Sequence, residues 1–461
     1  MKKQNKAEWI NEENIWALLE EGRHRKNYGE ILEKASTAKG LSPLEAATLL
    51  QTMDDELWNE IFSIARQVKE KIYGRRIVLF APLYISDYCI NSCLYCGYHR
   101  QNPTKRRRLS QKEIENEVQI LEEMGHKRLA VESGEDPVNA PLEYILESIE
   151  TIYRVRKANG NIRRVNVNIA ATTVEDYKQL KAAGIGTYIL FQETYHQPTY
   201  ERVHPSGPKH DYDWHTTAFD RAMEAGIDDV GSGVLFGLYD YRFEIIALLL
   251  HAAHLEKAFG VGPHTVSVPR LRTATGVNLS DFPLVTDEEF HKIVAIIRLA
   301  LPYTGMILST REEPALRREV ISLGISQVSA GSCTGVGGYS NKKSGISKPQ
   351  FEVADQRTMP QILEELIKDG YIPSFCTACY RQGRTGDRFM SLAKTGEIKK
   401  VCAPNAILTF QEYLLDYAPE STRIKGETVI NRELQQLPPE IINEVSTRIQ
   451  KIKQGERDLY F

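Results

Sequence analysis

Eight short apolar segments, separated by helical stretches, run from residue 76 to residue 330, and this alternation restricts the fold more than any other feature. Eight strands that alternate with helices predict an α/β protein, a (β/α)8 TIM barrel. A doubly wound open sheet is the alternative, but no Gly-x-Gly-x-x-Gly phosphate turn follows the first strand. The strands are expected at residues 76–83, 128–132, 164–169, 187–192, 230–237, 265–270, 306–310 and 326–330.

Helix signals place an N-terminal helical extension at residues 1–74, before the barrel at 75–370. Ser42, Pro43 and Glu45 fit an N-cap, a first-turn proline and a capping-box partner. Apolar residues then recur at three- and four-residue spacing, which gives one apolar helix face. The members of this face are Leu57, Ile61, Ile64, Val68 and Ile72, and two further capping boxes pair Ser110 with Glu113 and Thr286 with Glu289.

The C-terminal part, residues 371–461, follows a helix expected at 359–369 that returns along the outside of the barrel. It contains a second group of cysteines and two expected helices, near 405–417 and 438–453. The sequence therefore predicts a C-terminal iron–sulfur cluster domain after the barrel.

The overall charge excludes some classes of partner. The chain has 58 basic and 61 acidic side chains, so no global field favours nucleic acid or an anionic membrane. The basic run at 104–109 is expected to be a solvated loop, with partner docking as the alternative. The N-terminus lacks the apolar region of a signal peptide, and no apolar stretch approaches twenty residues, so we expect a cytoplasmic protein without a membrane span.

Six of the seven cysteines fall into two triads, which in a reducing compartment points to metal rather than to disulfides. Cys333 lies outside both triads and is expected to be a buried thiol.

The first triad, Cys89, Cys93 and Cys96, directly follows the first strand, at the face where barrel enzymes keep their active sites. Thiolates bind iron–sulfur clusters, and a cubane of four irons held by three thiolates has one iron open to an outside ligand. A zinc site completed by His99 or another donor is the alternative.

This spacing resembles the radical S-adenosylmethionine (SAM) enzymes. The resemblance implies that the open iron binds the methionine amino and carboxylate groups of SAM, and that the reduced cluster cleaves SAM to a 5′-deoxyadenosyl radical. Tyr95 would pack near the adenine. Gly134 and Glu135 match part of the Gly-Gly-Glu-like turn that binds the methionine amino group, although Ser133 replaces the first glycine. A plain charged loop remains an equal alternative for Glu132 and Asp136.

The third strand carries Asn166 and Asn168, which share one face by period-two alternation. Since asparagine needs partners when it is buried, a polar barrel interior is expected. Asn168 is a candidate cofactor contact, as is Glu193 at the end of the fourth strand. Together with the two asparagines, the stretch Ser329, Ala330 and Gly331 is small or polar enough to leave an internal channel.

The second triad, Cys376, Cys379 and Cys402, again has no fourth cysteine, so a second open cluster is expected. A zinc knuckle that borrows a histidine is the alternative. Barrel helices run back from the active face, so the chain after the last helix emerges at the opposite face. His264, just before the sixth strand, also lies at that face and is predicted to bind metal.

Five features together resemble the HydG family of tyrosine lyases, which mature the active site of FeFe-hydrogenase, over nearly the whole chain. They are the first triad, "RVNVNIAATT", "LFQETYH", "GPHTVSVPRLR" and the Cys-x2-Cys-x22-Cys tail. The resemblance implies that L-tyrosine is cleaved at Cα–Cβ to p-cresol and dehydroglycine, which becomes carbon monoxide and cyanide. It also implies two 4Fe–4S clusters, a labile extra iron on the second that His264 helps to hold, an external reductant, and other hydrogenase maturation proteins as partners.

Other functions remain open. A tyrosine lyase of the thiazole-biosynthesis type shares the barrel and first triad but not the tail. A two-cluster electron-transfer protein would be expected to have four cysteines per cubane and no large barrel. A zinc-stabilised scaffold would be colourless.

An amino-acid substrate needs a cation for its carboxylate, and arginine suits it best because of its paired donors. Ser309 and Arg311 stand at the end of the seventh strand, on the active face. Arg311 is the first candidate, although structural pairing with Glu312 or Glu313 is equally possible. Arg270 and Arg272 are second choices.

Overall fold

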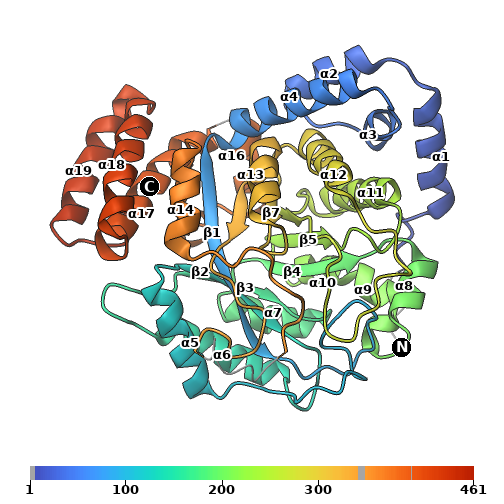
Figure 1. Cartoon of the computed structure of the whole chain (residues 1–461), viewed down its shortest axis with the longest axis horizontal. Coiled ribbons are helices and arrows are strands. Elements are labelled where there is room, and N and C mark those ends of the chain that lie inside the picture. Colours follow the sequence, from blue (N-terminus) through green and yellow to red (C-terminus); the bar gives the residue numbers. More distant parts are fainter. Residues whose placement is uncertain (1–5, 341–347, 396) are drawn as a thin grey trace.

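Parallel strands close into a barrel in this computed structural model, which describes residues 6–340, 348–395 and 397–461 (Figure 1). Each strand pairs in parallel with its neighbours, and β1 pairs with both β2 and β8. This closure confirms the predicted barrel and excludes the open sheet. The strands are β1 (Arg76–Ser86), β2 (Arg128–Ser133), β3 (Arg164–Asn168), β4 (Tyr188–Glu193), β5 (Val230–Val234), β6 (Thr265–Ser267), β7 (Gly305–Leu308) and β8 (Gln327–Ser329).

Three helices, α3 (Pro43–Leu50) of the N-terminal extension and two of the barrel, begin where the sequence signals place them. All three predicted capping boxes are present, at Ser42, Ser110 and Thr286. Each side-chain oxygen satisfies a backbone N–H that the first helical turn leaves without a partner. The helices between and after the strands are α5 (Gln111–Glu123), α6 (Leu142–Arg154), α7 (Val174–Ala182), α8 (Gln197–Val203), α9 (Tyr212–Thr216), α10 (Ala218–Glu224), α11 (Tyr241–Phe259), α12 (Asp287–Ala300), α13 (Pro314–Leu323) and α14 (Met359–Lys368).

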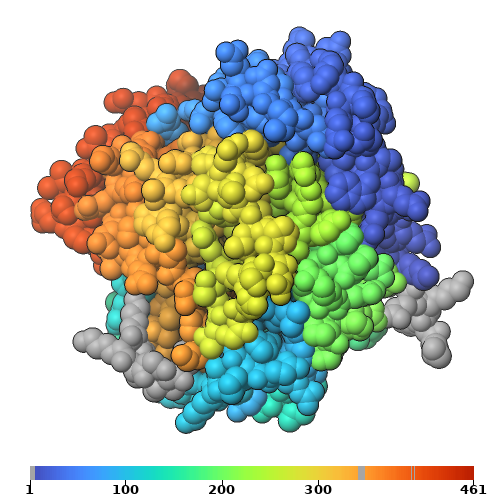
Figure 2. All heavy atoms as spheres, turned by 45° about the vertical axis from the view of Figure 1, so that its right-hand side comes forward, coloured from blue at the N-terminus to red at the C-terminus, as the bar shows by residue number. Residues whose placement is uncertain are grey.

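The N-terminal extension is helical, as predicted, and lies on the outside of the barrel. Its helices are α1 (Glu12–His24), α2 (Tyr28–Ser36), α3 (Pro43–Leu50) and α4 (Asp55–Tyr73). They contact α11, α12 and α13 (Figure 1), and Figure 2 shows the blue N-terminal segment lying directly on the yellow one. The apolar face of α4 is buried in one continuous core with these barrel helices. Among the helices described, none combines the length and apolar character needed to cross a membrane.

A ninth strand, β9 (Ile372–Ser374), determines where the C-terminal part begins. It pairs in parallel with Arg76–Val78, the first residues of β1, whereas β2 pairs only from Ala81 onward. Since β8 occupies the other edge of β1 at Val78, β9 lies on the edge that β2 leaves open at the N-terminal end of the barrel. The chain after α14 therefore enters at this end.

The C-terminal helices were predicted only in part. They are α15 (Ala378–Arg381), α16 (Gly386–Thr395), α17 (Ile398–Asp416), α18 (Glu420–Gln435) and α19 (Pro439–Lys453). Two match the predictions near 405–417 and 438–453, but α17 begins earlier and takes Pro404 into its interior. The helix α18 was missed because its buried face includes Thr422 and Gly426. Gly426 is needed there, since a Cβ would lie 2.6 Å from a methyl group of Leu414.

Candidate functional site

The first triad lies in the loop that follows β1, at the C-terminal face of the barrel. Backbone hydrogen bonds fix this loop, from Ile90 to the Glu135 carbonyl (2.8 Å) and from Leu94 to the Val203 carbonyl (2.9 Å). Cys89, Cys93 and Cys96 all line one pocket above the strand ends. This is where the sequence analysis expected them.

The surroundings of these sulfurs suit an iron–sulfur cluster. The Tyr98 backbone amide lies 3.4 Å from Cys96 Sγ. The side-chain amide of Asn91 lies 3.8 Å from Cys89 Sγ, and that of Gln350 lies 3.8 Å from Cys96 Sγ. Hydrogen bonds of this kind stabilise cluster thiolates. Burial raises the pKa of Cys96 to about 11 and that of Cys93 well above its usual value, so the thiolate form needs a metal.

A single metal ion fits these thiols less well. In the part of the chain that the structure describes, no three His, Cys, Asp or Glu side chains converge as they would around one ion. A cubane presents its irons at separate corners, so its ligands need not converge on a point.

The basic run at 104–109 is not the solvated loop that was predicted. The Arg106 guanidinium donates to the carbonyl oxygens of Asp87 (2.9 Å), Tyr98 (3.0 Å) and His99 (2.6 Å). Arg107 forms an ion pair with Glu113 at 2.7 Å. These contacts tie the segment to the loop of the first triad.

Replacement of Arg106 with alanine is expected to loosen this loop. Three carbonyl groups lose a charged donor, so a chelator should remove iron from the reconstituted protein roughly tenfold faster. Iron release followed by absorbance measures the effect, with the exposed neighbour Lys105→Ala as control. Equal release from both variants would contradict this role of Arg106.

Tyr95 is held at the pocket wall by a chain of hydrogen bonds. The Nδ1 of His204 lies 2.8 Å from the Tyr200 carbonyl, so it carries the proton and donates. His204 Nε2 is then an acceptor, and the Tyr95 hydroxyl donates to it at 2.7 Å. Burial lowers the pKa of His204 well below its usual value, which keeps the ring neutral. The aromatic face of Tyr95 is thereby fixed in place.

Gly134 and Glu135 are tied to the triad loop. A Cβ on Gly134 would lie 2.3 Å from the Tyr88 carbonyl oxygen, so only glycine allows this approach. Glu135 accepts a hydrogen bond of 2.6 Å from the Asn91 side chain, which also contacts Cys89. The structure thus brings the candidate SAM turn beside the candidate cluster.

The two acidic residues that flank this turn have different roles. Asp136 accepts from the amides of Val138 and Asn139, so the plain-loop alternative holds for it. Glu132 instead lines the pocket and accepts from the side chain of Asn168 at 2.7 Å. The plain-loop alternative is wrong for Glu132.

Glu193 lies in the pocket with a strained backbone. Its φ is 69°, in the left-handed region, at a register shift between β4 and β5. Such a bulge redirects a side chain, and backbone strain of this kind clusters at functional sites. Its carboxylate pairs with the ammonium of Lys209 at 2.8 Å. Lys209 also lines the pocket, and it was missed because its loop carries no periodic signal.

Arg311 and Ser309 follow β7 and line the same pocket. The Arg311 guanidinium lies over the Phe351 ring, 3.4 Å from its centre, and Ser309 Oγ accepts from the Arg311 amide at 3.3 Å. Within residues 6–340, 348–395 and 397–461, no carboxylate forms an ion pair with Arg311, while Glu312 pairs with both second choices, Arg270 and Arg272. Structural pairing with Glu312 or Glu313 is therefore not its role in this structure.

The second triad lies at the N-terminal end of the barrel, opposite the pocket. Cys376 lies two residues after the end of β9, and its carbonyl accepts from Arg128, the first residue of β2, at 2.8 Å. Cys402 packs in one apolar cluster with Phe389, whose ring centre lies 4.4 Å from that of His264. The structure thus places these cysteines and His264 at the end of the barrel that topology predicted.

This end of the barrel also has donors without protein partners. Four buried polar atoms make no hydrogen bond among the described residues: Arg128 Nε, His264 Nδ1, Thr265 Oγ1 and Thr377 Oγ1. Unpartnered buried polar atoms are costly unless something else satisfies them. Burial lowers the pKa of His264, which keeps its imidazole neutral, the form that binds metal. These residues fit a second metal group.

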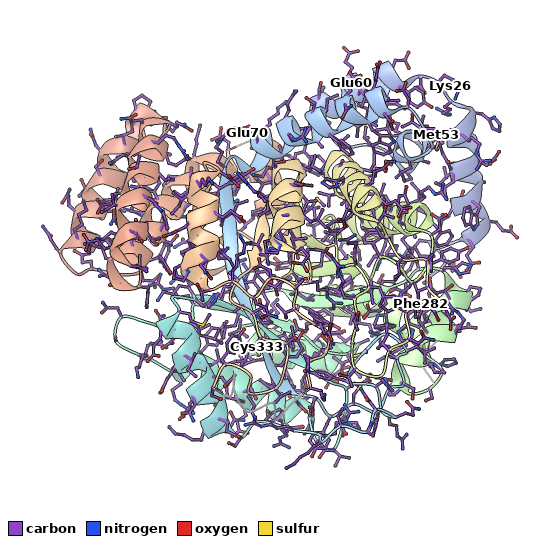
Figure 3. The ribbon with its side chains drawn as sticks, viewed as in Figure 1. Lys26, Met53, Glu60, Glu70, Phe282 and Cys333 are labelled. Atoms are coloured by element: carbon purple, nitrogen blue, oxygen red, sulfur yellow. The ribbon has the colours of Figure 1, made fainter. Side chains whose placement is uncertain are left out.

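Some predicted positions differ in the structure. Asn166 is buried and accepts from Arg164 at 2.9 Å, and Ser329 lines the pocket, as expected. Ala330 instead packs into the outer core, and a Cβ on Gly331 would meet Met124 outside the barrel, so neither lines a channel. Cys333 (labelled in Figure 3) is partly buried rather than buried.

Comparison with known proteins identifies two domain families and similar solved structures. Residues 83–251 match the radical SAM superfamily, and residues 267–372 match the biotin and thiamin synthesis associated domain. A crystal structure of HydG, described as a maturase of the [FeFe]-hydrogenase, superimposes with a TM-score of 0.96 and 60% identity, covering 99% of this chain and 100% of that chain.

Two further relatives are more distant. The HydG structure from Carboxydothermus hydrogenoformans gives a TM-score of 0.85 and 42% identity, covering 97% of this chain and 99% of that one. A 2-iminoacetate synthase of Salmonella typhimurium is 30% identical over 343 residues, which are 74% of this chain and 89% of the relative.

Proposed function

Since this chain belongs to the HydG family within the radical SAM superfamily, we propose that it is a tyrosine lyase that supplies carbon monoxide and cyanide for the active site of an FeFe-hydrogenase. It cleaves the Cα–Cβ bond of L-tyrosine to p-cresol and dehydroglycine, and the latter is converted to the two diatomic ligands. An external reductant and other maturation proteins are the expected partners.

One observation carries this proposal: a half-buried arginine without a carboxylate partner among the described residues shares a pocket with three cysteines. Arg311 offers paired donors to the carboxylate of an amino acid. Ser309 lies beside it, bonded to its backbone amide. Taking a charge out of water is expensive unless a partner is present, and a bound substrate carboxylate is such a partner.

Cys89, Cys93 and Cys96 would hold a 4Fe–4S cluster whose open iron binds SAM, and when bound, this group supplies the 5′-deoxyadenosyl radical. Tyr95, held by His204, would pack against the adenine. Glu135, Asn168 and Glu193 line the same wall of the pocket and are the proposed cofactor contacts.

Cys376, Cys379, Cys402 and His264 would hold a second 4Fe–4S cluster with an additional labile iron. The unpartnered Nδ1 of His264 supports this assignment, as does the donor set of three buried or partly buried thiols. We propose that residues 371–461 form the domain that carries this group, next to the barrel at 75–370 and the N-terminal extension at 1–74.

An anaerobic assay with tyrosine, SAM and dithionite tests the proposed function. The expected products are 5′-deoxyadenosine, p-cresol, cyanide and carbon monoxide. SAM cleavage without p-cresol would refute the tyrosine-lyase assignment.

A tyrosine lyase of the 2-iminoacetate synthase type is the second candidate, favoured by the 30% identity to that enzyme. It would form p-cresol and release the two-carbon fragment without carbon monoxide. The C-terminal triad beside His264 favours the first candidate. Membership in the radical SAM superfamily speaks against the electron-carrier and zinc-scaffold hypotheses.

Replacing Arg311 with lysine is expected to weaken tyrosine binding about tenfold or more while SAM binding changes little. Lysine keeps the charge but cannot offer paired donors to a carboxylate. Dissociation constants of both ligands, measured anaerobically, check this. Equal weakening of both ligands would point to a structural role of Arg311.

A further inference from the structure

Glu132 is a half-buried acid in the pocket, and the proposed reaction has so far given it no role. It stands near the end of β2, in register with Tyr84 of β1 and Asn168 of β3. It lines the same pocket as Arg311 and the first triad. Neither the methionine-binding turn nor the cluster loop forms a hydrogen bond with it among the described residues.

The partners of Glu132 leave one of its oxygens available. Its hydrogen bond within the described chain comes from Asn168 Nδ2, 2.7 Å from one carboxylate oxygen. No lysine, arginine or histidine of the described residues lies within ion-pairing distance. Asn168 therefore orients the carboxylate, and the second oxygen is free to accept from a ligand in the pocket.

The charges around Glu132 allow it to gain and lose a proton near neutral pH. Burial raises its pKa to about 8, Glu193 acts in the same direction, and Asn168 and Arg311 oppose the rise. Tyr84, its neighbour in register on β1, donates its hydroxyl to Gln350 and not to Glu132. An acid with such a pKa suits proton transfer at physiological pH.

In its ionised form Glu132 presents to the pocket a charge opposite to that of Arg311, and the two side chains form no ion pair with each other. An α-amino acid carries a carboxylate and an ammonium group on the same carbon, so it matches this arrangement of charges. We propose that Glu132 binds the ammonium group of the amino-acid substrate and accepts a proton from it, while Arg311 holds the carboxylate. The identity of this substrate as tyrosine rests on the proposed function.

The proton transfer is balanced within the site. One N–H bond of the ammonium breaks, its electron pair stays on nitrogen as a lone pair, and an O–H bond forms on Glu132. No oxidant or reductant takes part. The product is a neutral amine, whose lone pair stabilises a nitrogen radical, whereas an ammonium nitrogen has no lone pair to do so. Glu132 thus prepares the substrate for hydrogen-atom removal and makes the site specific for α-amines.

A substrate analogue without the amine tests this role. Anaerobic dissociation constants are measured for tyrosine, for 3-(4-hydroxyphenyl)propanoate, which lacks only the amino group, and for SAM. Glu132→Gln is expected to weaken tyrosine binding about 10- to 100-fold and to leave the binding of the other two ligands unchanged. The affinity of Glu132→Asp for tyrosine should lie between those of the parent protein and Glu132→Gln. Asp136→Asn, which alters the turn carboxylate nearby, is the matched control and should bind all three as the parent protein does.

The pH profile separates proton transfer from simple binding. Because ionised Glu132 is the acceptor, kcat/KM for p-cresol formation should rise with pH through a pKa near 8 in the parent protein. This rise should disappear in Glu132→Gln and persist in Glu132→Asp.

Three results with Glu132→Gln would overturn the role of Glu132. The first is that binding of tyrosine and of the amine-free analogue weakens equally, and the second is that SAM binding weakens as much as tyrosine binding. The third is an unchanged pH profile. If Glu132→Gln does not fold, the Asp variant decides, since its shorter side chain must still weaken tyrosine selectively. A parent protein that forms no p-cresol refutes the proposed function instead, so the two failures are distinguishable.

Discussion

Alanine at Cys93 is expected to abolish formation of 5′-deoxyadenosine. With three thiolates as the protein ligands of the first cluster, loss of one leaves two irons without protein ligands instead of one. Cys93 is also the most buried of the three, with 6% exposure, so water cannot easily replace it. The product measured by chromatography should fall to the level of a control without enzyme.

Cys333→Ala is the matched control, because this thiol lies outside both triads. It should keep SAM cleavage and iron content close to those of the parent protein. Retained cleavage in a reconstituted and folded Cys93→Ala protein would contradict the assignment of the first triad.

Conversion of both Cys376 and Cys379 to alanine is expected to leave p-cresol formation largely intact while carbon monoxide is lost. The two triads lie at opposite ends of the barrel, so tyrosine cleavage at one end does not need the thiols at the other. Cyanide is a weaker test, since we expect released dehydroglycine to give some cyanide without help from metal. Gas analysis and p-cresol assays on the same sample measure the separation.

His264→Ala should be milder than the cysteine changes, because it removes one proposed ligand of the proposed labile iron and spares the thiolates. In the His264→Ala variant, the spectroscopic signal of the proposed extra iron should decrease while that of the first cluster stays unchanged. If the double cysteine variant is folded and loses p-cresol formation as completely as Cys93→Ala, the proposal that the two ends of the barrel carry separate reactions is wrong. The second triad would then be structural or relay electrons to the first.

Periodicity and spacing were sufficient to predict the barrel and both groups of thiols. Strand and helix patterns are local, so β1 to β8 and the capping boxes at Ser42, Ser110 and Thr286 follow from short stretches of sequence. The thiol spacing is equally local. The opposite location of the second triad followed from chain direction alone, because parallel strands force each helix to return.

Contacts between distant segments were not predictable in this way. The strand β9 has too few residues for a periodic signal, and it exists because the lower edge of β1 is open. The basic run at 104–109 looks solvated in sequence, but the carbonyls that Arg106 binds belong to a loop folded back on it. Charge runs carry no information about such loops.

Some features of the candidate site were likewise predictable from the sequence, and others were not. By itself the sequence determined which residues are able to bind metal and which end of the barrel they occupy, since these depend on residue type and strand order. Only the tertiary structure decided that Glu312 pairs with Arg270 and Arg272, that Lys209 pairs with Glu193, and that Glu132 and Arg311 line one pocket. Pairing among buried charges depends on which side chains converge in space and which remain without a partner, and residues from different strands meet only once the barrel has closed.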